Sequence, residues 1–247
     1  GSGIVSLFDL NAFVGNGQIL DGALFNVGGV VTAGAVGQTG SLTIQGDYIQ
    51  TSGGVLGVDW SADGADLLVV NGDVSLGGLI AVNPLDGYVP TYGDTRRILS
   101  FAGERVGEFD GDNLPGVLYL ATTYGAGFVN VTVEAESFST QAQFQNGAQS
   151  GIAARLDNAR EGSYDALSNL YAPIDVLSGE DLTSAFENLV PHEHYQLRRA
   201  SEAHLELFAN QMRDVALGQG RAEASGQAMA AGFTARLMGG DQTARLD

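Results

Sequence analysis

Three histidines and two pairs of carboxylates are the residues whose types could carry chemistry. His192, Glu193 and His194 stand together, and His204 follows them. Two histidines that ligate a metal from one helix need the spacing His-Glu-x-x-His, which places them one turn apart. The His-Glu-His spacing does not do this. We therefore predict exposed polar positions on a helix, with no metal site and no cofactor.

The paired carboxylates are aspartates, Asp63 with Asp66 and Asp110 with Asp112. A pair of carboxylates at a suitable separation can serve as the acid and base of a glycosidase. Both pairs stand in strings that contain glycine, where aspartate is a favoured turn former because its side chain bonds to nearby backbone. We predict solvated turns for both, rather than catalytic or calcium-binding groups.

The first half of the chain lacks the residues that nucleophilic catalysis needs. Residues 1–135 contain neither His nor Lys, so a Ser-His-Asp triad is excluded there. The chain has no Cys, which removes thiolate nucleophiles, disulfides and thiolate-bound metals. Glycine strings such as Gly28-Gly29 lack the strand-to-helix context of a phosphate loop. We predict that the chain is not an enzyme.

The charge balance narrows the choice of partners. The net charge is −18 over 247 residues, and all 11 basic residues are arginine. A chain this acidic is repelled by phosphate backbones and by anionic lipid, so we expect no nucleic-acid partner. Its apolar runs are shorter than the roughly 18–20 residues that a membrane-spanning helix needs.

Basic and aromatic side chains in the first half are few enough to interpret one by one. Three arginines carry all of its positive charge, and we expect them to pair with nearby acids: Arg96, Arg97 and Arg105 with Asp94, Glu104 or Glu108. Each exposed pair of this kind contributes only ~0–1 kcal/mol. Trp60 is predicted to be a core or turn aromatic rather than a carbohydrate-stacking residue.

The composition changes near residue 135. Of the 36 glycines, 26 lie in residues 1–135, where they separate short apolar stretches. The stretches that alternate or are rich in β-branched residues are 42–44, 55–58, 67–70, 74–76, 79–82 and 129–133. Such runs, bounded by turn residues like Asn71-Gly72, predict strands of four to six residues. The first half is therefore predicted to be β.

A sandwich and a solenoid both consist of many short strands, and two features favour the solenoid. The turns are small and rich in glycine, as tight corners between stacked coils require. Related strings recur loosely, as in GSLTIQGD at 40–47 and VNGDVSLG at 70–77. We predict a right-handed parallel β-helix over 1–135, with an aromatic-rich cap at about 84–133, because the capping repeats of solenoids differ from the middle ones.

From about residue 144 the spacing of apolar residues becomes helical. Ser178 followed by Asp181 is a helix start signal, and Leu182, Phe186 and Leu189 then share one face. Weaker helical patterns surround Ile152 with Leu156 and Tyr164 with Leu167 and Leu170. A later stripe continues one face through Leu205, Phe208 and Met212. We predict a helical linker over 136–217 and a flexible segment over 218–247.

Two stretches resemble the classical autotransporters, a family of secreted bacterial proteins. The first comprises GSLTIQGDYIQ at 40–50, DLLVVNG at 66–72, PLDGYVP at 84–90 and YGAG at 124–127 with the valines that follow. It is similar to the C-terminal passenger segment of these proteins. The second comprises LSGEDL at 177–182 and continues through Pro191 and Tyr195 to Phe208-Ala209. It is similar to the helical linker that precedes their outer-membrane barrel, and the resemblance covers about 35–215.

The resemblance implies a location, a partner and a role. The location would be the cell surface or outer membrane, or the medium after processing, and the partner would be the protein's own C-terminal barrel, which 1–247 does not contain. The role would be that of an autochaperone, a stem that folds early outside the cell and templates the coils behind it. The expected folding nucleus comprises Tyr88, Tyr92, Phe101, Phe109 and Tyr119.

Two alternatives stay open beside the structural stem. The first is an adhesin that mediates cell-surface or biofilm attachment, which a patch of exposed apolar or aromatic residues along one face would support. The second is a polysaccharide-active β-helix enzyme, which needs two carboxylates facing each other across a groove. We also expect self-association through an exposed strand edge at the first coil, because such edges pair with neighbours.

Overall fold

The computed structural model describes residues 3–7, 12–20, 22–144, 146–190 and 206. By its contacts, Gly1–Val190 is one compact unit. Several predictions from the sequence lie outside the described residues. They concern the histidine group His192, His194 and His204, the linker residues Leu205, Phe208 and Met212, and the segment 218–247.

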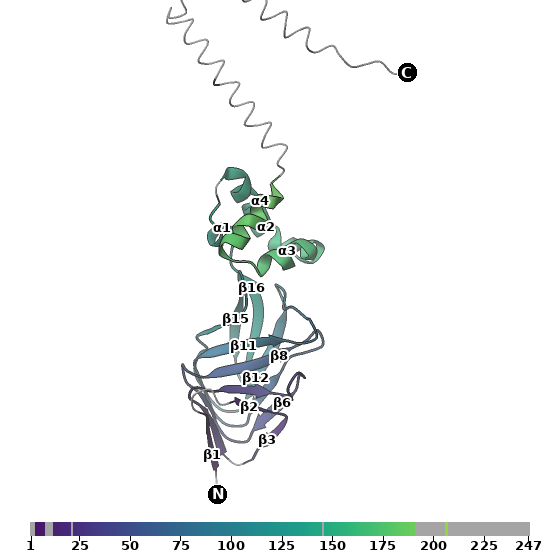
Figure 1. Cartoon of the computed structure of the whole chain (residues 1–247). Coiled ribbons are helices and arrows are strands. Elements are labelled where there is room, and N and C mark those ends of the chain that lie inside the picture. The colour runs from purple at the N-terminus through teal and green to yellow at the C-terminus, as the bar shows by residue number, and fades with distance from the viewer. Residues whose placement is uncertain (1–2, 8–11, 21, 145, 191–205, 207–247) are drawn as a thin grey trace, which may run out of the picture. The chain divides into compact units, whose positions relative to one another are not determined.

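Strands dominate the first part of the chain and form three separate sheets. Sheet A contains, in spatial order, β1 (Gly3–Leu7), β4 (Gly22–Asn26), β7 (Tyr48–Gln50), β10 (Val74–Leu76) and β13 (Arg105–Gly107). Sheet B contains β14 (Gly111–Asp112), β11 (Leu79–Pro84), β8 (Val55–Trp60), β5 (Val30–Ala33) and β2 (Ala12–Gly15). The strands within both sheets pair in parallel, and Figure 1 shows them stacked along the molecule.

Sheet C is parallel over most of its width and antiparallel at one end. It contains β15 (Leu118–Gly125), β16 (Phe128–Ala135), β12 (Thr95–Phe101), β9 (Leu67–Val70), β6 (Ser41–Ile44) and β3 (Gly17–Ile19). The hairpin of β15 and β16 pairs with β12 in antiparallel fashion. The chain visits the three sheets in turn, so each pass adds one strand to each sheet. We call one such pass a coil.

Alternation of side chains explains why these short segments become strands. In β5, β6 and β9 every second residue is buried, which is the period of a strand with one face on a core. Like residues stack in register on successive strands, as Leu42, Leu68 and Leu99 do in sheet C. None of these three leucines is more than 2% exposed. The core is therefore continuous from coil to coil.

Corners between the sheets bring the backbone of one coil against the next. Gly78 has a φ of +67°, and a Cβ atom there would lie 2.1 Å from the carbonyl oxygen of Gly54. Only glycine meets both conditions, because it tolerates positive φ and has no side chain. At another corner the Asp47 carboxylate accepts the N–H of Asp73 at 2.8 Å, and Asp73 in turn accepts the N–H of Glu104 at 2.8 Å.

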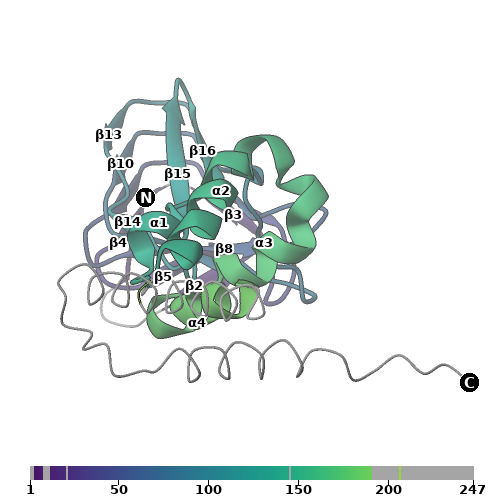
Figure 2. The ribbon, with the colours of Figure 1, turned by 90° about the horizontal axis from the view of Figure 1, so that it is seen from above.

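The chain becomes helical after β16. The helical elements are α1 (Phe138–Gln141), α2 (Gly147–Ser163), η1 (Asp165–Leu167), α3 (Ser168–Asp175) and α4 (Gly179–Leu189). They lie beyond the end of the sheets that β15 and β16 close (Figure 1, Figure 2). A second apolar core forms here, around Phe138, Tyr171, Leu182 and Phe186, all of which are fully buried.

The broad outline predicted from the sequence is confirmed: the chain is mainly β with parallel sheets, followed by a helical region. Each predicted strand stretch coincides with a strand. The predicted helix face also forms, since α4 buries Leu182 and Phe186. The predicted start at Ser178 has the right position but not the expected contact, because the serine side chain makes no capping hydrogen bond.

Candidate functional site

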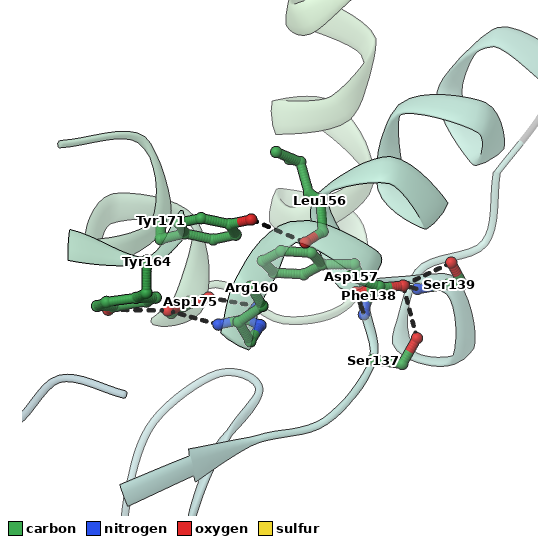
Figure 3. A network of polar contacts seen from close by, with 9 residues as sticks. All are labelled: Ser137, Phe138, Ser139, Leu156, Asp157, Arg160, Tyr164, Tyr171 and Asp175. Atoms are coloured by element: carbon green, nitrogen blue, oxygen red, sulfur yellow. Dashed lines mark hydrogen bonds and ion pairs between the residues drawn. The ribbon is translucent and has the colours of Figure 1, made fainter. Parts of the chain in front are cut away.

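A buried polar cluster lies in the helical region and centres on Arg160. Arg160 stands in the last turn of α2, and Asp175 ends α3. The guanidinium meets the carboxylate through two nitrogen–oxygen contacts, a hydrogen bond of 3.0 Å from Nη1 and an ion pair of 2.8 Å from Nη2. Both residues are at least 95% buried. Figure 3 shows the pair with the Tyr164 hydroxyl, which donates to the same carboxylate at 3.2 Å.

Aromatic rings enclose the guanidinium. Its carbon lies 4.5 Å from the ring centroid of Phe138, 4.9 Å from that of Tyr171 and 5.5 Å from that of Tyr92. Each ring face attracts the cation, and the attraction is stronger where water is excluded. The Tyr92 ring also lies 5.3 Å from Tyr164. Tyr92 belongs to the loop before β12, so this cluster includes a residue from the strand-rich part of the chain.

The backbone of Asp175 provides a second link to the strands. Its carbonyl oxygen accepts the N–H of Val117, the residue just before β15, at 2.8 Å. The neighbouring Gly116 has a φ of +69°, and a Cβ atom there would lie 2.1 Å from the Asp175 oxygen. Asp175 therefore binds α2 through its side chain, and through its main chain it binds Val117, the residue before β15.

A separate carboxylate on α2 fastens the first short helix. Asp157 accepts hydrogen bonds from the hydroxyls of Ser137 and Ser139, both at 2.6 Å. It also accepts the backbone N–H groups of Phe138 at 2.8 Å and Ser139 at 3.1 Å (Figure 3). These are N–H groups of the first turn of a helix, which lack partners within the helix. Asp157 thus caps α1 from another helix, one turn away from Arg160.

The protonation of these groups follows from their surroundings. Burial raises the pKa of the Asp175 carboxyl, while Arg160 and the Tyr164 hydroxyl act in the opposite direction. Burial, reinforced by the charge of Asp175, raises the pKa of Tyr164 to about 12. Burial alone would also raise the pKa of Asp157, but its four hydrogen-bond donors outweigh it and the pKa is lowered.

This arrangement is suited to holding structural elements together rather than to proton transfer. A guanidinium does not lose its proton in proteins, and the Tyr164 hydroxyl is a weaker acid than usual. The acceptor oxygens of Asp157 are occupied by backbone and serine donors. Two shallow hollows of about 320 and 240 Å³ flank Tyr92, and their walls include Glu161. What the cluster can do is hold three helices and the end of the sheets together.

A second buried carboxylate lies between coils, and it corrects a prediction. Asp63 is exposed at a bend, as expected. Asp110 is exposed but its carboxylate accepts the N–H of Gly78 at 2.6 Å, Asp112 is half-buried in strand β14 and not in a turn, and Asp66 is only 2% exposed. The carboxylate of Asp66 accepts the N–H of Gly40 at 2.7 Å and that of Asp59 at 3.1 Å. The prediction of a solvated turn is therefore wrong for Asp66, because two backbone donors replace the water.

The carboxylate of Asp59 extends this link to the next coil. It is 4% exposed and accepts a hydrogen bond from the side-chain amide of Asn83 at 2.7 Å. Asp59 and Asp66 thus connect Gly40, on the β6 side, with Asn83 on β11. Burial raises the pKa of Asp66 to about 6. The two backbone donors lower this pKa, whereas the nearby charge of Asp59 raises it further.

The five aromatic residues predicted as a folding nucleus do not form one cluster. Tyr88, Phe101 and Phe109 are half-buried and pack against the core between the sheets. Tyr92 packs instead against the helical core, and Tyr119 is 39% exposed. Whether these residues nucleate folding stays a prediction.

Trp60 is fully buried, as predicted, whereas the arginines mostly avoid the expected ion pairs. Of Arg96, Arg97 and Arg105, only Arg105 has an acidic partner among the described residues, which is Glu108 at 4.0 Å. Arg96 lies over the ring of Trp60 and Arg97 over that of Phe128, at 5.5 and 4.7 Å from the centroids. Aromatic faces replace carboxylates as their neighbours.

Sequence reasoning missed the central residues of the site. Arg160 and Asp175 are 15 positions apart, on different helices, and charged residues are mostly exposed. The available signal was weak: Arg160 is one of two arginines in a helical segment rich in small residues, and it is followed by the aromatic residues Tyr164 and Tyr171.

Comparison with known proteins gives no relative: no protein-family model matches the chain, and no curated protein matches it. Within the described residues, no group of three or more His, Asp or Glu side chains is placed to hold a metal ion. A search of the same residues for a helix long and apolar enough to cross a membrane finds none.

We predict that Arg160→Met lowers the free energy of unfolding by about 3–5 kcal/mol, because it leaves the Asp175 carboxylate buried without its charge partner. Urea unfolding followed by circular dichroism measures the change. The double variant Arg160→Met with Asp175→Leu should recover part of the loss. Arg105→Met is the matched control, since its ion pair is partly exposed and contributes about 0–1 kcal/mol. Equal losses at the two arginines would contradict the central role of Arg160.

We predict that Asp66 makes the protein less stable as the pH rises from about 4 to 7. The pKa is about 6 in the folded state, against 3.8 for an ordinary aspartate, so the folded state binds the proton more tightly. The resulting stabilisation is fully present below the unfolded-state pKa of 3.8 and is lost as the pH rises through the folded-state pKa of about 6. It amounts to about 3 kcal/mol.

Asp66→Asn removes this titration. The difference in unfolding free energy between wild type and Asp66→Asn, measured by urea titration at a series of pH values, should change between pH 4 and 6 and be constant above about pH 7. Other titrating groups cancel in this difference. A difference that is flat throughout would show that Asp66 titrates normally.

Proposed function

We propose that this chain is a structural stem: a right-handed parallel β-helix that is closed at its C-terminal end and folds from that end. The observation that carries the proposal is the strand order. Apart from β16, each sheet contains every third strand, and neighbouring strands run parallel except where β16 pairs with β12 and β15. A chain that winds through three sheets in this way gains one strand per sheet with every coil, so its length can grow without changing its cross-section.

The two ends of the stack differ, which supports growth in one direction. At one end the hairpin of β15 and β16 forms the last two strands of sheet C, and the helical region contacts the residue before β15 through the Asp175 carbonyl, which accepts the N–H of Val117. At the other end β1, β2 and β3 are each the last described strand of their sheet. An edge strand offers unpaired N–H and C=O groups to a further strand. The closed end is thus the natural template.

This reading fits the autotransporter resemblance, in which an early-folding C-terminal segment of a secreted passenger assists its passage across the outer membrane. Acidic charge, absence of cysteine and glycine-rich corners suit a chain that is threaded unfolded and then folds by adding coils. The surface role places the protein at the outer membrane or cell surface, or in the medium after processing. In this proposal the chain supports translocation and carries no catalytic activity.

The direction of folding can be tested with two matched phenylalanines. Phe101 lies in β12, the last strand of sheet C that pairs in parallel, and Phe13 lies in β2 of the first coil; both are half-buried against the same core. We predict that Phe101→Ala slows refolding, with a φ-value of about 0.5–0.8, whereas Phe13→Ala mainly speeds unfolding, with a φ-value of about 0–0.3. Stopped-flow fluorescence of Trp60 measures both rates. Equal φ-values, or the reverse order, would overturn folding from the C-terminal end.

The link to autotransporters has its own test in the gene. We predict that the coding region after Asp247 specifies about a dozen amphipathic strands of about ten residues each, the pattern of an outer-membrane barrel. Reading the genomic sequence downstream decides the point. A stop codon directly after Asp247 would remove the export role and leave a free-standing β-helical binding protein.

A further inference from the structure

We propose that the outer face of sheet A carries a docking site for a basic segment of another protein, which inserts a lysine or arginine side chain into a hollow between three coils. The inference goes beyond the stem function and does not depend on it. It rests on a hollow with an apolar floor and an acidic rim. Seen from the helical end, β10 and β13 lie on a side of the stack that α2 and α3 do not cover (Figure 2).

The hollow has a volume of about 230 Å³, and each of three successive coils gives it one acid and, two positions later, one floor residue. These pairs are Asp47 with Ile49, Asp73 with Ser75, and Glu104 with Val106. The floor residues form one column, because Ile49 lies in register with Ser75 and Ser75 with Val106. Val106 is 68% exposed. The short side chain of Ser75, between two longer apolar ones, makes the depression.

The corners of the coils hold the rim acids in place. Each acid follows a glycine, at Gly46, Gly72 and Gly103. A Cβ atom on Gly72 would lie 2.2 Å from Oδ1 of Asp47, and one on Gly103 would lie 2.1 Å from Oδ1 of Asp73. The same two oxygens accept the backbone N–H groups of the next coil. Among the described residues no hydrogen-bond donor reaches Oδ2 of either aspartate, so one oxygen of each carboxylate is available to a ligand.

The negative charge of the rim has no partner in the described part of the chain. Neither of the two ion pairs found there includes a rim acid. Arg105 directly follows Glu104, but its guanidinium carbon lies 4.3 Å from the ring centroid of Tyr124 and it does not line the hollow. Neighbouring strands lie about 4.8 Å apart, and like charges at this separation repel each other. A cation in the hollow removes this repulsion.

A basic side chain matches both parts of the hollow. Lysine and arginine bury their apolar stems along an apolar surface and keep the charged head in a polar environment. Pockets for small molecules usually measure about 300–1,000 Å³, so this smaller hollow suits one side chain of a longer segment. A second copy of this chain has a net charge of −18 and is repelled. Charge complementarity therefore selects a basic segment of a different protein.

Isothermal titration calorimetry of the full chain with a short peptide of alternating lysine and valine tests the proposal. In an extended peptide this alternation places the lysines on one face. We expect binding that weakens between about 0.05 M and about 0.5 M salt, because salt screens the attraction between the lysines and the rim. The same peptide with glutamate in place of lysine should not bind.

Two variants separate the rim from the floor. Asp73→Asn removes the central charge but keeps an acceptor for the Glu104 N–H, and should weaken binding about fivefold. Ser75→Leu fills the hollow without changing the charge, and should weaken binding at least about tenfold. Asp63→Asn removes an exposed charge outside the hollow, and Thr43→Leu enlarges a half-buried outward residue of sheet C. Both controls should stay within about twofold of wild type.

Four results would overturn the proposal. They are a lysine–valine peptide that does not bind, equal weakening by Asp73→Asn and Asp63→Asn, full binding by Ser75→Leu, and spermidine that binds as tightly as the peptide. The second would show general attraction to an acidic chain, and the fourth would make the ligand a free amine. Circular dichroism of each variant checks that the fold is retained, so loss of binding cannot be mistaken for unfolding.

Discussion

Apart from β15, which pairs only with β16, every described strand in the three sheets depends on a strand of another coil for its backbone hydrogen bonds. A segment such as β10, with three residues between turns, is far too short to be stable by itself. Because the coils must repeat at the spacing of hydrogen-bonded strands, their corners must also stack at that spacing. This is why Gly78 approaches the oxygen of Gly54, and why Asp73 uses its carboxylate to bind the backbone of the next corner.

Apolar stacking alone leaves the register of the coils weakly fixed, and buried polar groups supply what is missing. Inside sheet A the side chain of Gln50 accepts the hydroxyl of Tyr48 at 2.6 Å and donates to the carbonyl of Gly77 at 2.7 Å. The amide of Asn26 lies on the adjacent strand and donates to Val55. A slip of two residues keeps each side chain on its own face, so one aliphatic residue could replace another. The same slip would leave these polar groups buried without partners, at a cost of about 1–3 kcal/mol each.

The sequence predicted the strands well because their signal is local: apolar runs alternate and end at glycine or asparagine. It also predicted helix α4, whose apolar face repeats every three or four residues. The features that the sequence did not predict are polar residues that are buried because they pair with residues far away in the sequence. Asp66 resembles a turn residue until Gly40 and Asp59 surround it, and Arg160 resembles a surface residue until Asp175 and three rings enclose it.

The C-terminal end of the stack differs from the rest in the sequence separation of its contacting residues. Neighbouring coils join residues that are 18 positions apart, as Ala12 and Val30 are, to 32 positions apart, as Leu79 and Gly111 are, so the chain must close a long loop for each coil. The hairpin of β15 and β16 pairs residues as near as Gly125 and Phe128, and the helices add contacts within their own segment. Local contacts form before distant ones, because less chain entropy is lost when they close. Among the described strands the antiparallel hairpin lies at this one end of the stack, which is the physical argument for our proposal that folding starts there.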